Sequence, residues 1–278
     1  MKPLIVICAL IAQLLPGIVR GDTPYAVKVP ATGEVVHCTA YPPQLAPGAK
    51  AGLVIHLYGH GGSNIVFNAG RPPFDVIRRR ITERGYWLIV PDLGPRHWMS
   101  DDAVDRLDAV IKEWTQKEDI DPARVHLLGS SMGASSSLLY VMRRPGKIRS
   151  VAAIFPVTDQ VRFFTDAPNY RESVGPAHHV TDANREAVLR AISPLYHAEA
   201  FQQTPVFLVH GAKDTVVNVA HSREFAAALQ KQGSPVIYRE SPEEGHHDEI
   251  VVSFQEEIAD FLTKADANSG PARAGWSR

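Results

Sequence analysis

A serine flanked by glycines is the first feature of this sequence whose residue types and spacing indicate chemistry. The pentapeptide Gly129-Ser130-Ser131-Met132-Gly133 follows a short apolar run, residues 125–128, and precedes a helical pattern, residues 134–142. In the G-x-S-x-G motif the glycines permit a sharp strand-to-helix turn that exposes the central serine. The N-terminus of the helix then places backbone N–H groups beside the hydroxyl. We therefore predict that Ser131 is a nucleophile.

A nucleophilic serine needs a general base, and the base needs a carboxylate that orients it, because the hydroxyl alone is barely acidic at neutral pH. With this motif the expected chain order is Ser, then Asp or Glu, then His. Asp214 follows the apolar run 206–209, and His246 precedes the last helical pattern. We predict Asp214 as the acid and His246 as the base. His247 is an alternative base, and Asp159 is an alternative acid or else a helix cap.

Hydrolysis by a serine also needs backbone donors for the developing oxyanion. The loop Tyr58-Gly59-His60-Gly61-Gly62 follows the apolar run 53–57, and its glycines let the backbone approach a substrate. One donor is expected to be the N–H of Met132, the residue after the nucleophile. The second is expected from His60 or Gly61. A glycine turn without function is the alternative interpretation.

The composition argues against several other kinds of site. The chain has 29 Lys+Arg and 30 Asp+Glu, so it lacks the basic excess of a nucleic-acid-binding protein. Two cysteines are too few for a disulfide framework or a Cys-based zinc site. Cys38 lies in a strand pattern and is expected to be a buried apolar residue. The pair His178-His179 has no partner at ligand spacing, and we predict neither a metal nor an organic cofactor.

Short apolar strands that alternate with amphipathic helices must position these residues. The apolar runs lack polar alternation, which is typical of strands buried on both faces of a parallel sheet. They lie at residues 53–58, 87–90, 125–128, 151–155, 206–209 and, more weakly, 236–238. The pattern of residues 25–41 predicts a pair of antiparallel strands. The whole pattern predicts an α/β fold with a doubly wound, mostly parallel sheet.

The sequence also indicates two helix boundaries and one segment that interrupts the alternation of strands and helices. Ser100 is a predicted N-cap, because Asp101 and Asp102 follow it in the first turn. Gly233 is the predicted end of a later helix. Residues 156–200 follow a strand but contain no further strand pattern. We predict a small lid-like insertion at about residues 160–195 in this segment.

The two ends of the sequence differ from the rest in composition. Residues 1–21 combine a basic start, an apolar run and small residues before a cleavage point near Gly21, as in a secretory signal peptide. We expect a secreted or periplasmic protein without stable membrane association after cleavage, and a retained N-terminal anchor is the alternative. Residues 22–264 are predicted to form one domain. Residues 265–278 are rich in small residues and are predicted to be a disordered tail.

These motifs together resemble the α/β-hydrolase superfamily, and within it the catalytic domain of the prolyl oligopeptidase family and its single-domain esterase relatives. The likeness covers about residues 50–264. Besides the motifs above, it rests on Ile120-Asp121-Pro122-Ala123-Arg124-Val125, Ser193-Pro194-Leu195-Tyr196-His197, Thr204-Pro205-Val206 and His210-Gly211-Ala212-Lys213-Asp214. The resemblance implies an α/β-hydrolase fold, and it places the family triad on Ser131, Asp214 and His246.

The sequence departs from the family in places that bear on substrate choice. Tyr58 stands where the family's glycine loop usually begins with His, and a tyrosine there either buttresses the loop or points into the pocket. We expect Tyr58, Trp98 and Tyr170 to contact substrate, because the last two lie in the loop after residues 87–90 and in the insertion. Only about 30 residues of the expected mature chain precede the core, too few for the β-propeller domain of the multidomain peptidases. This favours esters over peptides.

We therefore predict an exported serine hydrolase that cleaves a small-molecule or oligomeric carboxylic ester through an acyl-enzyme. A serine peptidase of the prolyl oligopeptidase type is the nearest alternative. A catalytically inactive hydrolase fold that serves as a binding protein is an alternative of another class. The sequence leaves the acyl group, the alcohol group and the oligomeric state open.

Overall fold

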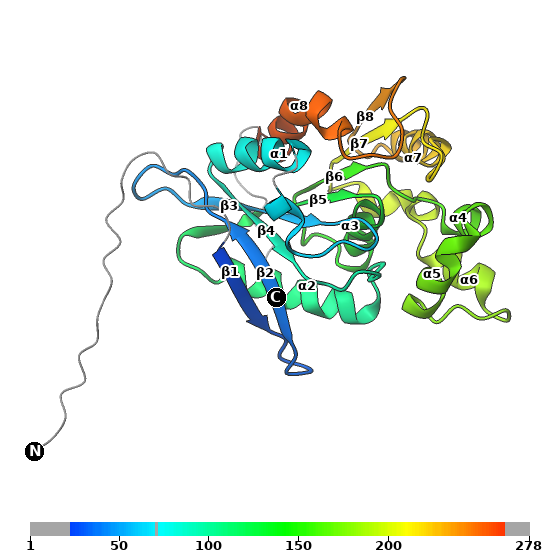
Figure 1. Cartoon of the computed structure of the whole chain (residues 1–278), viewed down its shortest axis with the longest axis horizontal. Coiled ribbons are helices and arrows are strands. Elements are labelled where there is room, and N and C mark those ends of the chain that lie inside the picture. Colours follow the sequence, from blue (N-terminus) through cyan, green and yellow to red (C-terminus); the bar gives the residue numbers. More distant parts are fainter. Residues whose placement is uncertain (1–22, 70–71, 265–278) are drawn as a thin grey trace, which may run out of the picture.

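The apolar runs form the strands of one eight-stranded sheet in a computed structural model that describes residues 23–69 and 72–264 (Figure 1). The strands are β1 (Thr23–Lys28), β2 (Val35–Tyr41), β3 (Ala51–Leu57), β4 (Tyr86–Pro91), β5 (Ile120–Ser130), β6 (Ser150–Ile154), β7 (Val206–Gly211) and β8 (Val236–Ser241). The predicted signal peptide, residues 1–21, and the predicted tail, residues 265–278, lie outside the described residues.

The strand order is β1-β2-β4-β3-β5-β6-β7-β8. The pairs β1–β2 and β2–β4 are antiparallel, and every other neighbouring pair is parallel. This confirms the predicted doubly wound, mostly parallel sheet and the antiparallel opening. All residues of β3, β6 and β7 are buried, because helices cover both faces of the centre of the sheet. Strand β8 is the edge and alternates in burial, which explains its weaker apolar signal.

The covering helices are α1 (Pro72–Glu83), α2 (Asp101–Thr115), α3 (Met132–Arg143), α7 (Ala220–Lys231) and α8 (Ile250–Lys264). Helices α1 and α8 lie together on one face of the sheet, and α2 and α3 lie on the other (Figure 1). The Ser100 hydroxyl accepts the Ala103 N–H and caps α2, as predicted. No sequence pattern was assigned to α1, which buries Phe74, Ile77 and Ile81.

The segment between β6 and β7 contains only helices. They are α4 (Gln160–Asp166), η2 (Pro168–Tyr170), α5 (Arg171–Ala177), α6 (Arg185–Ala191) and η3 (Pro194–Phe201), after a shorter η1 (Val66–Ala69) that follows β3. Helices α4, α5 and α6 form a lobe at one end of the molecule (Figure 1). Within the described ranges, no helix is both long enough and apolar enough to cross a membrane.

Candidate active site

The turn between β5 and α3 presents Ser131, because the strand ends at Ser130 and the helix begins at Met132. Ser131 has a φ of 53°, a conformation that costs a residue other than glycine about 1–3 kcal/mol. The turn also requires both of its glycines. A Cβ atom at Gly133 would lie 1.9 Å from the carbonyl oxygen of Leu57, and one at Gly129 would lie 2.4 Å from the carbonyl oxygen of Gly133. The glycines therefore allow the turn to pack directly against β3.

Three side chains from distant parts of the chain meet at this turn. The Nε2 atom of His246 lies 3.0 Å from the Ser131 Oγ, and its Nδ1 atom lies 2.7 Å from the Asp214 Oδ2. Asp214 follows β7, and His246 lies in the loop between β8 and α8. They meet because the carboxyl ends of parallel strands share one edge of the sheet. The structure thus brings together the three residues that the motifs predict.

The Asp214 carboxylate is held on both of its oxygens. Oδ1 accepts the N–H groups of Val216 and Val217, each at 2.8 Å, and Oδ2 faces His246. Burial by itself raises the pKa of Asp214, but hydrogen bonds from His210 and His246 outweigh it and hold that pKa below its ordinary value. Because the ionised carboxylate can only accept a hydrogen bond, the Nδ1 atom of His246 must carry the proton. The Nε2 atom of this imidazole is then free to accept the serine proton.

Phe155 supports the His246 ring and was not identified from the sequence. It follows β6, and the two ring centroids lie 4.4 Å apart. Its φ of 40° is strained for an aromatic residue, and the backbone is held by a hydrogen bond from its N–H to the Val209 carbonyl. Only its position directly after a buried strand could have indicated this role.

The glycine loop after β3 lies against the nucleophile, since a Cβ atom at Gly59 would be 3.6 Å from the Ser131 Cβ. The Gly61 N–H donates to the carbonyl of Pro95 at 2.7 Å, so it is not available to a substrate. Gly61 as an oxyanion donor was therefore the wrong alternative. In the part of the chain that the structure describes, neither the His60 N–H nor the Met132 N–H donates to a protein acceptor. The Met132 group is one of the unpaired N–H groups at the start of α3.

The structure contradicts the prediction that Tyr58 contacts substrate. Its side chain is 1% exposed and points beneath the loop that follows β4. The hydroxyl donates to the Asp92 Oδ1 at 2.9 Å and accepts the Leu93 N–H at 3.0 Å. These bonds hold the buried hydroxyl against the loop after β4, so Tyr58 buttresses this loop and the glycine loop.

Trp98 is also turned inward, while Tyr170 stays partly exposed. Trp98 is 3% exposed, and its Nε1–H donates to the Ser173 hydroxyl of α5 at 3.0 Å. This bond fixes the ring between the loop after β4 and the insertion, which leaves almost no surface for a substrate and contradicts the predicted contact. Tyr170 packs edge-on against the His60 ring, with centroids 5.1 Å apart. Of these two aromatics, Tyr170 is the one that borders the glycine loop with accessible surface.

His247, the alternative base, points elsewhere. Its ring nitrogens lie 3.3 Å from Glu244 and 3.4 Å from Glu249, and its side chain is about half exposed at 49%. The structure shows no contact between His247 and Ser131, whereas His246 contacts both the serine and the acid. The geometry therefore supports His246 as the base.

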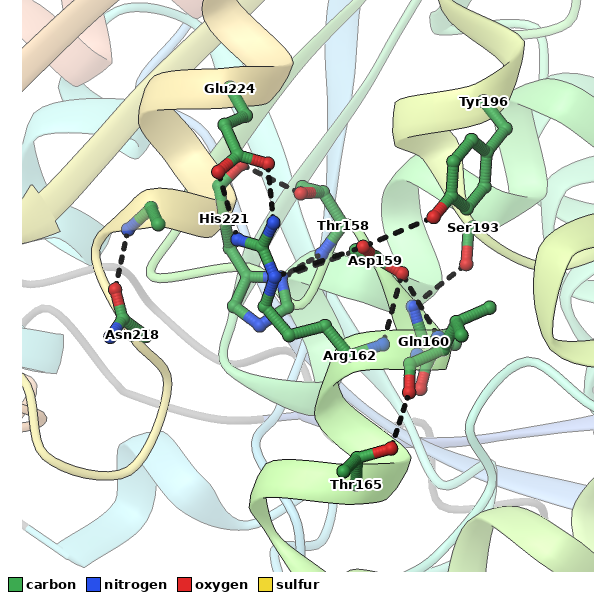
Figure 2. Close-up of polar contacts among 12 residues, drawn as sticks. Thr158, Asp159, Gln160, Arg162, Thr165, Ser193, Tyr196, Asn218, His221 and Glu224 are labelled. Carbon is green, nitrogen blue, oxygen red and sulfur yellow. Dashed lines mark hydrogen bonds and ion pairs between the residues drawn. The ribbon is translucent and has the colours of Figure 1, made fainter.

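Asp159, the alternative acid, caps a helix. Its Oδ1 accepts the N–H groups of Val161 and Arg162 at the start of α4, and its Oδ2 accepts the Tyr196 hydroxyl at 3.2 Å (Figure 2). The Asp159 N–H donates to His221 Nδ1 of α7 at 3.2 Å. This network ties the insertion to the helical layer beside β8. Asp159 is thus the structural cap that its position after β6 also allowed.

The remaining histidines do not assemble a metal site among the residues that the structure describes. No group of three or more His, Cys, Asp or Glu side chains there has the arrangement of a metal site. His178 is buried, and its Nε2–H donates to the Trp98 carbonyl at 2.9 Å. His56 and His126 are buried on β3 and β5.

Comparison with known proteins agrees with this architecture. The model of the prolyl oligopeptidase family matches residues 92–268. Esterase LipQ of Mycobacterium tuberculosis (strain ATCC 25618 / H37Rv) is 28% identical over 250 residues, which cover 79% of this chain and 57% of that protein. This chain thus spans little more than half of that relative.

Two solved structures share the fold at low sequence identity. A puromycin-hydrolysing peptidase of Mycobacterium tuberculosis superimposes with a TM-score of 0.75 at 22% identity, covering 90% of this chain and 40% of that one. A ferulic acid esterase superimposes with a TM-score of 0.69 at 15% identity, covering 88% of this chain and 98% of that one. The family match covers more than half of the residues, and the fold is that of its structural neighbours. The chain therefore belongs to the prolyl oligopeptidase family and has an α/β-hydrolase fold.

Proposed function

We propose that this hydrolase cleaves carboxylic esters through an acyl-enzyme on Ser131, with His246 as general base and Asp214 as the orienting acid. The observation that carries the proposal is the continuous chain of contacts from Asp214 Oδ2 through both nitrogens of His246 to the serine hydroxyl. This order of contacts is the one that serine hydrolases need in order to remove the serine proton and stabilise the imidazolium that forms.

The reaction follows from these contacts. The His246 Nε2 accepts the Ser131 proton while Oγ attacks the ester carbonyl carbon. The N–H groups of His60 and Met132 donate to the oxyanion, and the loss of one such donor typically costs about 10²–10³ in rate. His246 then gives its proton to the departing alcohol. Water, activated by the same imidazole, cleaves the acyl-enzyme and restores the serine.

The preference for esters is supported by the curated relative esterase LipQ, which is 28% identical over 250 residues. The family match and the puromycin-hydrolysing peptidase that shares the fold keep a serine peptidase as the second candidate, since both reactions use the same nucleophile and base.

A Ser131→Ala variant tests the nucleophile. It should lower kcat by about 10⁴- to 10⁶-fold on a nitrophenyl ester, because attack through the serine is lost, while the thermal unfolding midpoint stays unchanged. A fluorophosphonate should label the unmodified protein, and peptide mapping should place the adduct on Ser131 and not on Ser130. A folded protein that forms no adduct would instead support an inactive binding protein.

A substrate panel separates the two candidate activities. Nitrophenyl esters and aminoacyl or prolyl anilides offer the same reporter group on different bonds. We expect a higher kcat/KM for the esters, beyond the difference in their uncatalysed rates. Anilide cleavage that exceeds ester cleavage after this correction would reverse the assignment in favour of the peptidase.

A further inference from the structure

A second histidine contacts the proposed catalytic acid. His210 is the penultimate residue of β7, and its side chain is fully buried. Its Nε2 atom lies 3.2 Å from the Asp214 Oδ2 and 2.9 Å from the carbonyl oxygen of Val217. The Asp214 Oδ2 therefore lies between two imidazole rings, one from His246 and one from His210.

The partners of His210 fix its tautomer. A carbonyl oxygen and an ionised carboxylate can only accept, so the Nε2 atom that faces both of them must carry the proton. The Nδ1 atom lies 2.7 Å from the Ser222 hydroxyl on α7, which can donate to it. Both nitrogens of this buried ring thus have partners. The ring is oriented by α7 on one side and by the loop after β7 on the other.

We propose that His210 is a positioning residue of the catalytic site, whose Nε2–H ties the Asp214 carboxylate to the backbone at Val217. This inference rests on the proposed function of Asp214 as the acid that orients His246. The Oδ1 atom of Asp214 already holds the N–H groups of Val216 and Val217. The shared Nε2–H of His210 adds a tether to Oδ2, the oxygen that contacts the base.

The tether matters because the direction of Oδ2 sets the direction of the His246 ring. Without it, the carboxylate can rotate about its side-chain bonds while Oδ1 keeps the backbone hydrogen bonds. A displacement of about 1 Å at a catalytic group can cost about 10²-fold in rate. Substrate binding does not involve this oxygen, so the loss should fall on kcat and not on KM.

Two amide substitutions at one position test the inference. In His210→Gln the side-chain amide nitrogen reaches about as far as the Nε2 of histidine, whereas in His210→Asn it is one methylene shorter and cannot reach Oδ2. We expect the Asn variant to lose about 10- to 100-fold in kcat with KM unchanged, and the Gln variant to regain most of the loss. The measurement is steady-state hydrolysis of a nitrophenyl ester, with thermal unfolding recorded for each variant.

His126 supplies a matched control. It is also fully buried on a strand, and its Nδ1 atom lies 2.8 Å from the hydroxyl of Ser150 at the amino end of β6, whereas Asp214 follows the carboxyl end of β7. His126→Asn and His126→Gln should lower stability without a selective loss of kcat. The control therefore separates a positioning effect from the general cost of losing a buried histidine.

The kcat values of the folded variants decide whether His210 positions Asp214. Equal kcat values for folded His210→Asn and His210→Gln, or a loss no larger than in the His126 pair, would overturn the inference. If His210→Asn does not fold, the kcat of His210→Gln tests the inference instead. A kcat more than tenfold below that of the unsubstituted protein in folded His210→Gln would contradict the tether. Fluorophosphonate labelling of Ser131 in the unsubstituted protein identifies a failure of the proposed function separately from a failure at His210.

Discussion

The partner of each polar atom decides whether a residue near Ser131 serves the reaction or the scaffold. His246 and Asp214 use their polar atoms on each other and on the serine. Tyr58 is the first residue of the glycine loop, but its hydroxyl is already committed to Asp92 and Leu93. The same comparison removes Gly61 from the oxyanion site, because its N–H donates to a carbonyl of the neighbouring loop.

A Tyr58→Phe variant tests this distinction. The change leaves the buried Leu93 N–H without its acceptor, so the free energy of unfolding should fall by about 1–3 kcal/mol. Because the hydroxyl does not face the substrate, kcat should change far less than the roughly 10²- to 10³-fold that typically accompanies the loss of an oxyanion donor. Urea unfolding and ester hydrolysis measure the two effects. A selective drop in kcat of that size would show that the hydroxyl contacts the oxyanion.

The triad could be predicted from the sequence, whereas the direction of Tyr58 could not. Ser131, Asp214 and His246 each follow a recognisable strand, and parallel strands deliver such residues to one edge of the sheet. The orientation of Tyr58 depends on Asp92, which is 34 residues away and carries no local signal of that contact. Contacts of this kind arise only after the loops have folded over one another.

At the scale of elements, two buried histidines attach the insertion to the rest of the domain. His178 on the insertion donates to the carbonyl of Trp98, and His221 of α7 accepts the N–H of Asp159. Burial lowers the pKa of each of these histidines from 6.5 to about 4. For His221, the positive charge of Arg162 lowers the pKa further. Both attachments thus favour a neutral imidazole.

Acidification should therefore loosen the insertion. The unfolded state binds a proton at these histidines below pH 6.5, and the folded state does so only near pH 4, so stability falls as the pH is lowered through this interval. Protonation of His221 Nδ1 removes the acceptor of the Asp159 N–H. In hydrogen exchange followed by mass spectrometry, protection factors of the segment that follows β6 should fall near pH 4 before those of β3. A simultaneous loss in both places would contradict this attachment.

A helix or strand could be predicted where its signal lies in neighbouring residues of the sequence. The cap of α2 was identified because Ser100, Asp101 and Asp102 are consecutive. Helix α1 was not predicted, although its buried residues Phe74, Ile77 and Ile81 recur at spacings of three and four and Arg78 to Arg80 occupy positions between them. Its burial depends on α8, which lies beside it on the same face of the sheet and is distant in sequence.

At the scale of the whole molecule, Cys38 reports on the integrity of the sheet. It lies in β2, which pairs with β1 on one side and with β4 on the other. The side chain is 1% exposed, and burial, together with the nearby charge of Asp92, raises the pKa of its thiol to about 12. A thiol in this state is unreactive, because alkylation requires both access and the thiolate form.

Alkylation of Cys38 should therefore follow global unfolding. Access to the thiol requires β2 to separate from β1 and β4 and from the buried side chains packed on it, which breaks up the antiparallel end of the sheet. We expect iodoacetamide to modify Cys38 in the native protein at least roughly 10⁴-fold more slowly than in the unfolded chain, as a stability of several kcal/mol requires. The rate, measured by peptide mapping, should rise with urea with the same slope as the equilibrium unfolding curve. A rate that does not depend on urea below the transition would instead identify a local opening at the β1–β2 edge and show that this antiparallel pair is not part of the cooperative unit.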